Sequence, residues 1–523
     1  MNRFAQVLAA AIFCCSLAAC ERSATDADRT VESRSLIRGN GANPGTLDPA
    51  LAEDIHAFNI LIDMYEGLVA ESARGELVPG AASDWSISDD GTVYTFELRN
   101  DARWSNGDSV LAMDFVRSMR RVAASETSSS YAFVLEPILH FKDVNSGARP
   151  AEELGVRAVS ESLLEIRLSK PANHFLAVLA LPVCFPTHIS GDQQISNGAF
   201  SLVDRRIGGP VRLKRNTYFW AADTVAIEEV VYLPIVDPLA EFNMYRAGEL
   251  DITHNIPSEM IAAAMDEFGD ETRISPSLAL YYIALDLSEA PFQDPDLRQA
   301  MSMVIDRGKI AELLGRGESP AYGIVPPGVS GYQSASYEWG GLSKEYREHR
   351  ARELYSQAGF SSLSPLKVRF VYAAGGVHER IALAVSAIWR DTLGVKTTLE
   401  KREWKYFLDT RDRRQDWDVM HFAWVGDYNS PTSFLEIFES GNEQNLSGHA
   451  SATYDDLLSQ GRGEIDPDGS NELMRLAEEE LLAGYPVIPL YFYVSKHMVK
   501  VDIAGFENNA MDRHPSRYIS FGN

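Results

Sequence analysis

Cysteine is scarce in this sequence, and its scarcity excludes a disulfide-stabilised fold. The 523 residues contain 4 cysteines, and Cys14, Cys15 and Cys20 all lie near the N-terminus. Cys184 therefore remains as the one thiol of the body, and a single thiol cannot form an intramolecular disulfide. It lies in the apolar run LALPVCFP, so we expect a small buried hydrophobic residue rather than a nucleophile. Stability must come from the core.

Positive charge is also in short supply. The sequence has 48 Lys and Arg against 74 Asp and Glu, which gives a formal net charge of -26. This balance argues against nucleic acid and anionic membrane surfaces as partners. With 45% hydrophobic residues, the chain can form two or three domains or one large interwoven unit.

The motifs of common enzyme classes are missing from the sequence. It contains no H-E-x-x-H, no G-x-S-x-G and no P-loop, and its histidines do not recur at metal-ligand spacing. An enzyme would need a nucleophile or a metal that this pattern does not offer. We therefore expect no enzymatic activity, no cofactor and no metal.

Long apolar runs are limited to one segment at the N-terminus. Arg3 precedes the apolar run Val7 to Leu17, which is too short to span a bilayer. The run ends in LAAC, which matches the bacterial lipobox and predicts removal of residues 1–19 and lipidation of Cys20. An ordinary cleaved signal with an incidental cysteine is the alternative. Residues 20–34 are polar and read as a flexible tether. We expect a soluble body that meets a membrane only through the lipid on Cys20.

The most informative stretch runs from Trp417 to Leu435. A strand-like apolar run ends at Gly426, and the carboxylate of Asp427 follows directly, between Trp424 and Tyr428. An acid at the end of an apolar strand suggests a carboxylate held in an aromatic cleft to receive a cation. The alternative is an N-cap or Asx-turn acid that organises the loop.

Strands and helices alternate in the C-terminal half. Lys367 to Tyr372 and Val395 to Glu400 read as strands around a helix over Glu379 to Leu393. This β-α-β rhythm predicts a partly parallel sheet with helices on its faces. Ser83 to Leu98 alternates like a β-hairpin. No linker divides the chain, so we expect any two lobes to be joined by strands.

Several motifs in a fixed order resemble the peptide/nickel class of extracellular solute-binding proteins, the capture components of ABC importers. The run YTFELRNDARWSNGDSVLAMDFVRS, residues 94–118, is similar to the signature of that class. The further matches are LDP (47–49), MYEGL (64–68), SNGAF (196–200), YRAGELD (245–251), PAYG (320–323), EWKYFLDTR (403–411) and GDYNSPTSFL (426–435). Together they resemble the periplasmic oligopeptide-binding proteins and the similar murein-tripeptide binder, from about Ser35 to the C-terminus. The segment between Thr187 and Ser196 is shorter than is usual in that family.

The resemblance implies an α/β, two-lobed periplasmic-binding-protein fold, class II-like and of cluster C, with an extra subdomain on the N-terminal lobe. Lobe I would comprise residues 35–60, 190–285 and 495–523, with the extra subdomain at 61–189 and lobe II at 286–494. Strands near Tyr281 to Leu287 and Val487 to Val494 would cross between the lobes. Ligand would favour the closed state through its differential affinity for it.

The resemblance also implies the residues of a peptide site. Asp427 would take the α-ammonium, and extended backbone near Ala423 to Val425 would pair with the peptide by β-augmentation. The matching pocket positions are Glu53, Tyr131, Trp404, Trp424, Asn445 and Tyr493. Plain core packing is the alternative for each aromatic residue among them.

The carboxylate end of the ligand is where the sequence departs from the family. His421 stands where oligopeptide binders carry an arginine, and a histidine is only partly charged and cannot fork onto a carboxylate. Arg411 matches a family arginine, and Arg413 or Arg414 could assist, although RDRR also reads as a solvated charge run. His378 matches a histidine that meets the carboxylates of longer peptides, or is a surface histidine. We expect short peptides of unresolved length, with weakened tripeptide binding.

The resemblance finally implies partners and a compartment. The partners would be short peptides and an ABC permease of the inner membrane, for a monomeric protein in the periplasm, lipid-anchored to a cell membrane. The alternatives are a dedicated murein-tripeptide binder, a signalling lipoprotein that presents its ligand, and a binder of a nickel chelate or an oligosaccharide.

Overall fold

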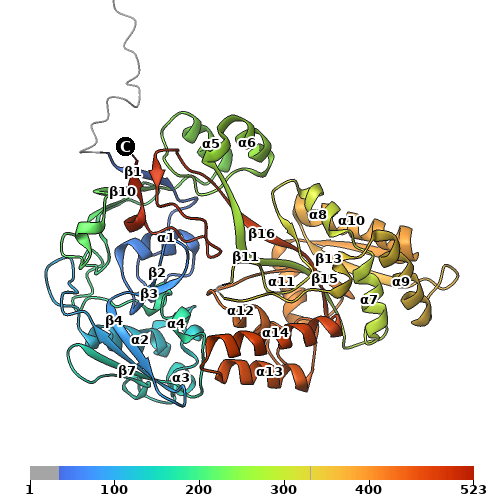
Figure 1. The fold of residues 1–523 in the computed structure, drawn as a ribbon, viewed down its shortest axis with the longest axis horizontal. Coiled ribbons are helices and arrows are strands. Elements are labelled where there is room, and N and C mark those ends of the chain that lie inside the picture. Colours follow the sequence, from blue (N-terminus) through green and yellow to red (C-terminus); the bar gives the residue numbers. More distant parts are fainter. Residues whose placement is uncertain (1–33, 330, 523) are drawn as a thin grey trace, which may run out of the picture.

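The computed structural model describes residues 34–329 and 331–522. The predicted signal peptide, the lipidation site Cys20 and the residues before Arg34 lie outside them. Figure 1 shows two α/β bodies side by side, joined by the long strands β11 (Thr272–Leu285) and β16 (Val487–Met498). These strands pair with each other from Thr272 opposite Met498 to Ala284 opposite Val487, with irregular register in between.

The first body contains two four-stranded sheets. One sheet has the order β1-β10-β9-β8 and the other the order β4-β5-β7-β6. The strands of the first sheet are β1 (Leu36–Gly39), β8 (Phe200–Arg205), β9 (Val211–Arg215) and β10 (Glu229–Leu233). Those of the second are β4 (Ala82–Ile87), β5 (Val93–Leu98), β6 (Val156–Ala158) and β7 (Leu163–Arg167). The β4–β5 pair confirms the predicted hairpin, because Tyr94, Phe96 and Leu98 alternate into the core.

The second body is built on a six-stranded sheet of order β12-β16-β11-β15-β13-β14. Strand β13 is parallel to both β14 and β15, whereas β11 is antiparallel to both β15 and β16. The predicted partly parallel sheet is therefore confirmed. Besides β11 and β16, this sheet contains β12 (Ser319–Pro320), β13 (Lys367–Ala373), β14 (Lys396–Arg402) and β15 (Val419–Val425). The small pairs are β2 (Val69–Glu71) with β3 (Leu77–Pro79) and β17 (Ile503–Ala504) with β18 (Ser520–Phe521).

Helices cover these sheets, and several begin at an Asp-Pro pair. Asp237, Asp294 and Asp466 each cap a helix whose first residue is proline, a position where the missing N–H costs no hydrogen bond. In the first body lie α1 (Ile55–Met64), α2 (Ala112–Ala123), α3 (Phe141–Asn145), α4 (Phe175–Val178), α5 (Pro238–Arg246) and α6 (Ile261–Phe268). In the second lie α7 (Pro295–Met303), α8 (Arg307–Leu314), α9 (Lys344–Gln357), α10 (Gly376–Leu393), α11 (Trp404–Arg413), α12 (Thr432–Leu435), α13 (Ala452–Gly463) and α14 (Pro467–Gly484).

Each body has its own hydrophobic core. One cluster runs from Leu36 to Ile252 and also takes in Val499, Phe506 and Ile519 near the C-terminus. The other lies between Leu278 and Phe492. A smaller third cluster packs α5 and α6 against Met498. Among the described residues, no helix has both the length and the apolar character needed to cross a membrane.

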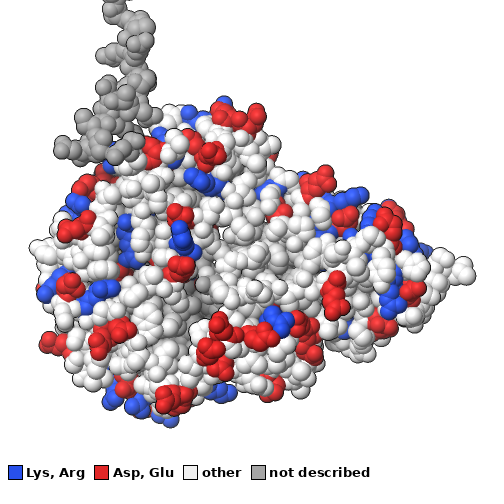
Figure 2. Space-filling view, viewed as in Figure 1, with Lys and Arg blue, Asp and Glu red and all other residues white. Residues whose placement is uncertain are grey.

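Charge is spread over the visible surface. Figure 2 shows acidic and basic side chains interspersed on this face, with acidic ones gathered over α13 and α14. Many of these groups form exposed ion pairs, such as Arg475 with Glu472 at 2.6 Å. On this face, exposed ion pairs of this kind contribute little to stability and keep the charged groups in solvent.

Candidate functional site

The loop after β15 carries Asp427 and is tightly fixed at its start. Gly426 donates its N–H to the Leu278 carbonyl of β11 at 2.8 Å. A Cβ on Gly426 would lie 2.7 Å from Cε2 of the buried Phe434, so a side chain does not fit there. The N–H of Asp427 then donates to Ser433 Oγ at 3.1 Å. This geometry holds the Asp427 backbone against the crossover strand.

Three ionisable groups meet around the half-buried Asp427. Burial raises the pKa of its carboxyl, while Arg513 and a hydrogen bond from the Tyr131 hydroxyl act in the opposite direction. Burial and the nearby Asp427 raise the pKa of Tyr131 to about 12, so its hydroxyl remains a donor. Arg513 Nη2 donates to the Asp427 carbonyl at 3.2 Å, and its Nη1 pairs with Glu71 at 3.0 Å. The acid thus lies at a junction between the two bodies.

The aromatic neighbours of Asp427 anchor its loop on both sides. Trp424 Nε1 donates to the Ser433 carbonyl at 2.6 Å. Tyr428 is buried in the core of the first body, where its ring stacks on His174 with centroids 5.2 Å apart. Its hydroxyl donates to Glu436 at 3.2 Å, and burial raises the pKa of Glu436 to about 7. The loop therefore spans the two bodies through Tyr428 as well as through Asp427.

His421 lies in the sheet rather than in solvent. Its side chain is 4% exposed, and Nε2 accepts the Ala373 N–H at 3.0 Å. The ring stacks with those of His378, Phe407 and Tyr281, at centroid distances of 4.2, 4.8 and 5.4 Å. Burial, and then His378, lower the pKa of His421 to about 3. His421 is therefore a neutral ring at this position and supplies no cation.

A cation that sequence reasoning missed lies close to this aromatic stack. Arg316 precedes β12 and pairs with the fully buried Glu318 at 2.8 Å. Its charge contributes to the lowered pKa of His378, after burial, and acts on Tyr493 and Tyr491 as well. The signal available in the sequence was its position shortly before the PAYG motif at 320–323.

The other predicted basic residues have different surroundings. Arg411 is half-buried, and its guanidinium lies 5.8 Å from the Phe422 ring centroid. Arg413 pairs with Asp409 at 3.0 Å on the surface, and Arg414 donates to the Glu443 carbonyl at 2.9 Å. His378 contacts the Tyr281 hydroxyl through Nδ1 at 3.2 Å.

The remaining predicted pocket residues divide into accessible and enclosed ones. Glu53 is exposed, and Trp404 is 56% exposed with its ring stacked on Phe407. Tyr493 is half-buried against Tyr491. Asn445 is 2% exposed, and its amide bonds within its own loop to the residues Phe438, Glu439, Ser447 and His449. The amide of Asn445 therefore organises its own loop, and its place in a ligand pocket stays a prediction.

Strand β15 presents an edge beside Asp427. In the described ladders, β13 pairs with β15 only at Val419 and Met420, so the strand beyond them is unpaired on that side. Ala423 is exposed and Val425 is 66% exposed. An unpaired edge of this kind can accept another extended segment.

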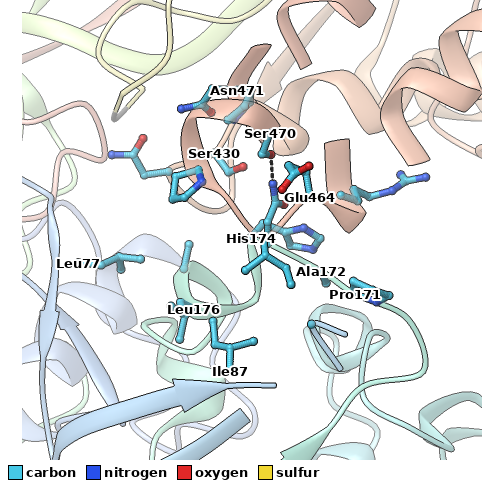
Figure 3. Close-up of a pocket in the computed structure, with 18 of the residues that line it drawn as sticks. Leu77, Ile87, Pro171, Ala172, His174, Leu176, Ser430, Glu464, Ser470 and Asn471 are labelled. Carbon is cyan, nitrogen blue, oxygen red and sulfur yellow. Dashed lines mark hydrogen bonds between the residues drawn. The ribbon is translucent and has the colours of Figure 1, made fainter. Parts of the chain in front are cut away.

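A cavity of about 630 Å³ lies behind the Asp427 loop, where the two bodies touch (Figure 3). Its walls come from the 171–177 segment of the first body and from α13 and α14 of the second. Asn173 bridges them, donating its side chain to the Gly461 carbonyl at 3.0 Å and its N–H to the Arg462 carbonyl at 3.2 Å. Asn429 and Ser430 line the cavity, whereas Asp427 does not.

Comparisons with known proteins place these features in a family context. The model of the bacterial extracellular solute-binding proteins, family 5 (middle), matches residues 76–445. The periplasmic oligopeptide-binding protein OppA of Salmonella typhimurium is 34% identical over 518 residues, which cover 96% of this chain and 95% of the relative.

Solved structures agree with the observed architecture. The unliganded open form of MppA, a periplasmic murein tripeptide binding protein, has a TM-score of 0.88 and 32% identity, covering 94% of this chain and 98% of that one. Haemophilus influenzae OppA in complex with RPPGFSPFR has a TM-score of 0.73 and 29% identity, covering 94% and 99%. The predicted two-lobed α/β periplasmic-binding-protein fold is confirmed, and the backbone is nearer to an open form than to a peptide complex.

Proposed function

Because the chain belongs to family 5 of the bacterial extracellular solute-binding proteins, we propose that it is the substrate-binding component of a peptide ABC importer. Short peptides would lie between the bodies, with the α-ammonium on Asp427. The predicted division stays part of this proposal: lobe I at 35–60, 190–285 and 495–523, its extra subdomain at 61–189, and lobe II at 286–494.

The Asp427 carboxylate is the observation that carries the proposal. It is half-buried, burial raises its pKa, and no cation forms a salt bridge with it in the described part of the chain. Arg513 lies close by but donates to the Asp427 carbonyl rather than to its carboxylate, so an ammonium group brought by a ligand could form the ion pair that this carboxylate lacks. The Tyr131 hydroxyl supplies a hydrogen bond that helps to hold the ionised form.

The edge of β15 supports binding of the peptide backbone. The exposed segment from Ala423 to Val425 leads directly to Asp427, so one extended ligand could meet both. Main-chain pairing reads no side chain and therefore fits a broad range of peptides. The accessible rings of Trp404 and Trp424 add apolar contact area that can pack against many different ligand side chains.

The carboxylate end of the ligand needs a cation, and Arg316 is the strongest candidate. The predicted His421 is buried and neutral, whereas the Arg316 guanidinium lies near Tyr493 and His378. Arg411, whose guanidinium lies beside the Phe422 ring, remains a second candidate. We therefore assign the carboxylate end to the region around Arg316.

An extracytoplasmic location belongs to the same proposal, because the relatives are periplasmic binding proteins. A lipid anchor on Cys20, a monomeric state and an inner-membrane permease as partner complete it. The relatives are substrate-binding proteins, which agrees with a role in capture rather than catalysis.

The test is a binding cycle between the protein and the ligand's α-ammonium. Calorimetry would compare a short alanine peptide with its N-acetylated form on the wild type and on Asp427→Asn. Breaking one side of a buried pair costs roughly 3–5 kcal/mol, so each single change should weaken binding by that amount. The two changes together should cost little more than either alone, because both remove the same pair.

A matched control removes a carboxylate elsewhere. Asp409 is an exposed acid paired with Arg413, and Asp409→Asn should leave peptide affinity unchanged. The role of Asp427 would be contradicted if N-acetylation and Asp427→Asn lowered the binding free energy additively. It would also be contradicted if Asp427→Asn and Asp409→Asn lowered peptide affinity equally. Native mass spectrometry of the purified protein would then separate a ladder of mixed peptides from one dedicated ligand such as a murein peptide.

A further inference from the structure

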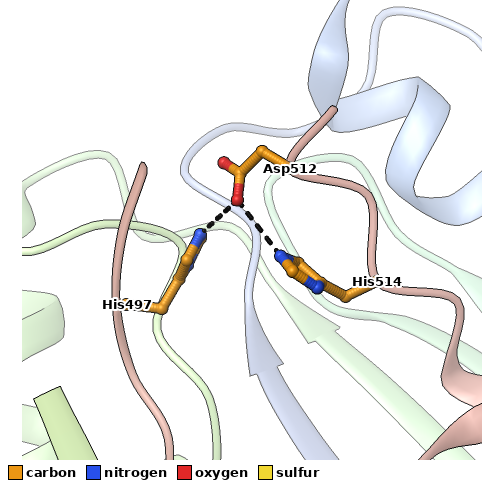
Figure 4. A group of neighbouring side chains, drawn as sticks. All are labelled: His497, Asp512 and His514. Carbon is orange, nitrogen blue, oxygen red and sulfur yellow. Dashed lines mark hydrogen bonds and ion pairs between the residues drawn. The ribbon is translucent and has the colours of Figure 1, made fainter. Parts of the chain in front are cut away.

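Three side chains from β16 and from the segment that follows it converge beside the end of that strand (Figure 4). His497 lies near the end of that strand, while Asp512 and His514 belong to the C-terminal segment. Nε2 of His497 is 2.8 Å from Asp512 Oδ1, and Nε2 of His514 is 3.1 Å from the same oxygen. One ligand atom from each residue lies within 4.8 Å of the others.

The surroundings orient both imidazoles. Nδ1 of His497 is 2.9 Å from the Thr253 carbonyl, which can only accept, so Nδ1 carries a proton. A metal that displaced the proton shared between Nε2 and Asp512 would then meet the lone pair of Nε2. Such a hydrogen bond from the far nitrogen to a carbonyl is the usual support of a metal-binding histidine. The His514 ring is stacked on Phe506 with centroids 3.8 Å apart, which fixes its direction.

The backbone also brings the donors together. Asp512 has φ of 55°, in the left-handed region, and its N–H donates to the Asn509 carbonyl at 3.2 Å. This turn directs Asp512 and His514 toward the same strand. Both histidines are buried, whereas the Asp512 side chain is 35% exposed, which leaves a route for an ion from solvent.

We propose that His497 Nε2, His514 Nε2 and Asp512 Oδ1 form a binding site for a divalent transition-metal ion of the Zn²⁺ type. Two imidazole nitrogens and one carboxylate oxygen are a donor set that such ions accept, with a water in the fourth position on the exposed side of Asp512. Ligands at about 2.0–2.1 Å in a tetrahedron are roughly 3.3 Å apart, so the two nitrogen–oxygen distances of 2.8 and 3.1 Å need only a small outward shift. The ion would fasten the C-terminal segment to a crossover strand.

This site adjoins the proposed peptide site through Arg513, which lies between Asp512 and His514 and donates to the Asp427 carbonyl, but its three ligands are different residues. It shares no residue with the Asp427 loop or with the Arg316 region, and it needs no peptide to form. The competing explanation is a metal-free network in which protons alone join the two rings to Asp512. Metal binding therefore has to be measured directly.

The experiment strips the full protein with a chelator and titrates Zn²⁺ against a chromogenic competitor. Cobalt(II) then serves as a spectroscopic probe, because nitrogen and oxygen ligands in a tetrahedral site give it a visible absorption band. We expect one saturable site per chain in the wild type. His497→Arg places a cation beside Asp512 and offers no lone pair to a metal. Asp512→Asn removes the anionic ligand. Each change should weaken Zn²⁺ binding by at least about a hundredfold.

Controls keep the result decisive. His349 is a 76%-exposed histidine near Glu353 on α9, and His349→Ala should leave the Zn²⁺ affinity and the cobalt band unchanged. If His497→Arg fails to fold, His514→Gln, which keeps a planar polar side chain on Phe506, takes its place. Absence of a saturable site in the wild type would overturn the proposal, and so would a site of unchanged affinity in these variants.

Discussion

Arg316 offers a quantitative test of how the carboxylate end of a peptide is held. Replacing Arg316 alone would leave the fully buried Glu318 without its partner, and a lone buried charge costs roughly 3–5 kcal/mol of stability. The double change Arg316→Met with Glu318→Gln removes both charges while keeping similar volume. It should therefore fold with a small change in stability and remove only the cation offered to the ligand.

The expected loss of affinity follows from the chemistry of the contact. A hydrogen bond from a guanidinium to a carboxylate contributes about 1.5–3 kcal/mol, which corresponds to roughly ten- to a hundredfold in affinity. Calorimetry with a free-acid peptide and its C-terminal amide would show this loss for the free acid alone. Equal weakening of both ligands, or no weakening of either, would refute the assignment of Arg316. Arg413→Met, on the surface, is the control.

Two further predictions concern buried carboxylates. Burial raises the pKa of Asp427, and an ammonium ligand needs the ionised carboxylate. Peptide affinity should therefore be full above this raised pKa and fall as the pH drops through it. Calorimetry across acidic pH should show this fall for the wild type and no such fall for Asp427→Asn. Glu478 is fully buried and accepts hydrogen bonds from the N–H groups of Ile324, Val325 and Ala335 and from the Tyr332 hydroxyl. Glu478→Ala should lower the free energy of unfolding by at least about 3 kcal/mol, because several buried donors lose their hydrogen-bond acceptor. A loss below about 1 kcal/mol, measured by chemical denaturation, would contradict this account.

Local sequence signals predicted much of the architecture. The alternation in Ser83 to Leu98 and the β-α-β rhythm from Lys367 to Glu400 both correspond to observed strands and helices. The apolar pattern of the sequence predicted only part of β11. The strand begins at Thr272, whereas the predicted aromatic-rich strand starts at Tyr281. The earlier residues are extended because β16 pairs with them, and such pairing is a tertiary effect.

Residues of the candidate site could be predicted from the sequence only where they lie together in one continuous segment. Asp427 could be singled out because strand, glycine and acid are consecutive. Arg513, which touches its carbonyl, arrives from the C-terminal segment, so no spacing rule could link the two. The His497–Asp512–His514 cluster escaped for the same reason, since its ligands come from two separated segments. Asn445 was placed in a pocket by resemblance, while its surroundings show that its amide is used within its own loop.

The pairing of β11 with β16 also determines the order in which the molecule can be completed. These strands are adjacent in space, yet the whole second body lies between them in the chain. The core of the first body additionally includes Val499, Phe506 and Ile519, which follow the whole second body in the chain. Pairings across such a sequence separation form slowly. The core of the first body can therefore be completed only after the whole second body has been synthesised.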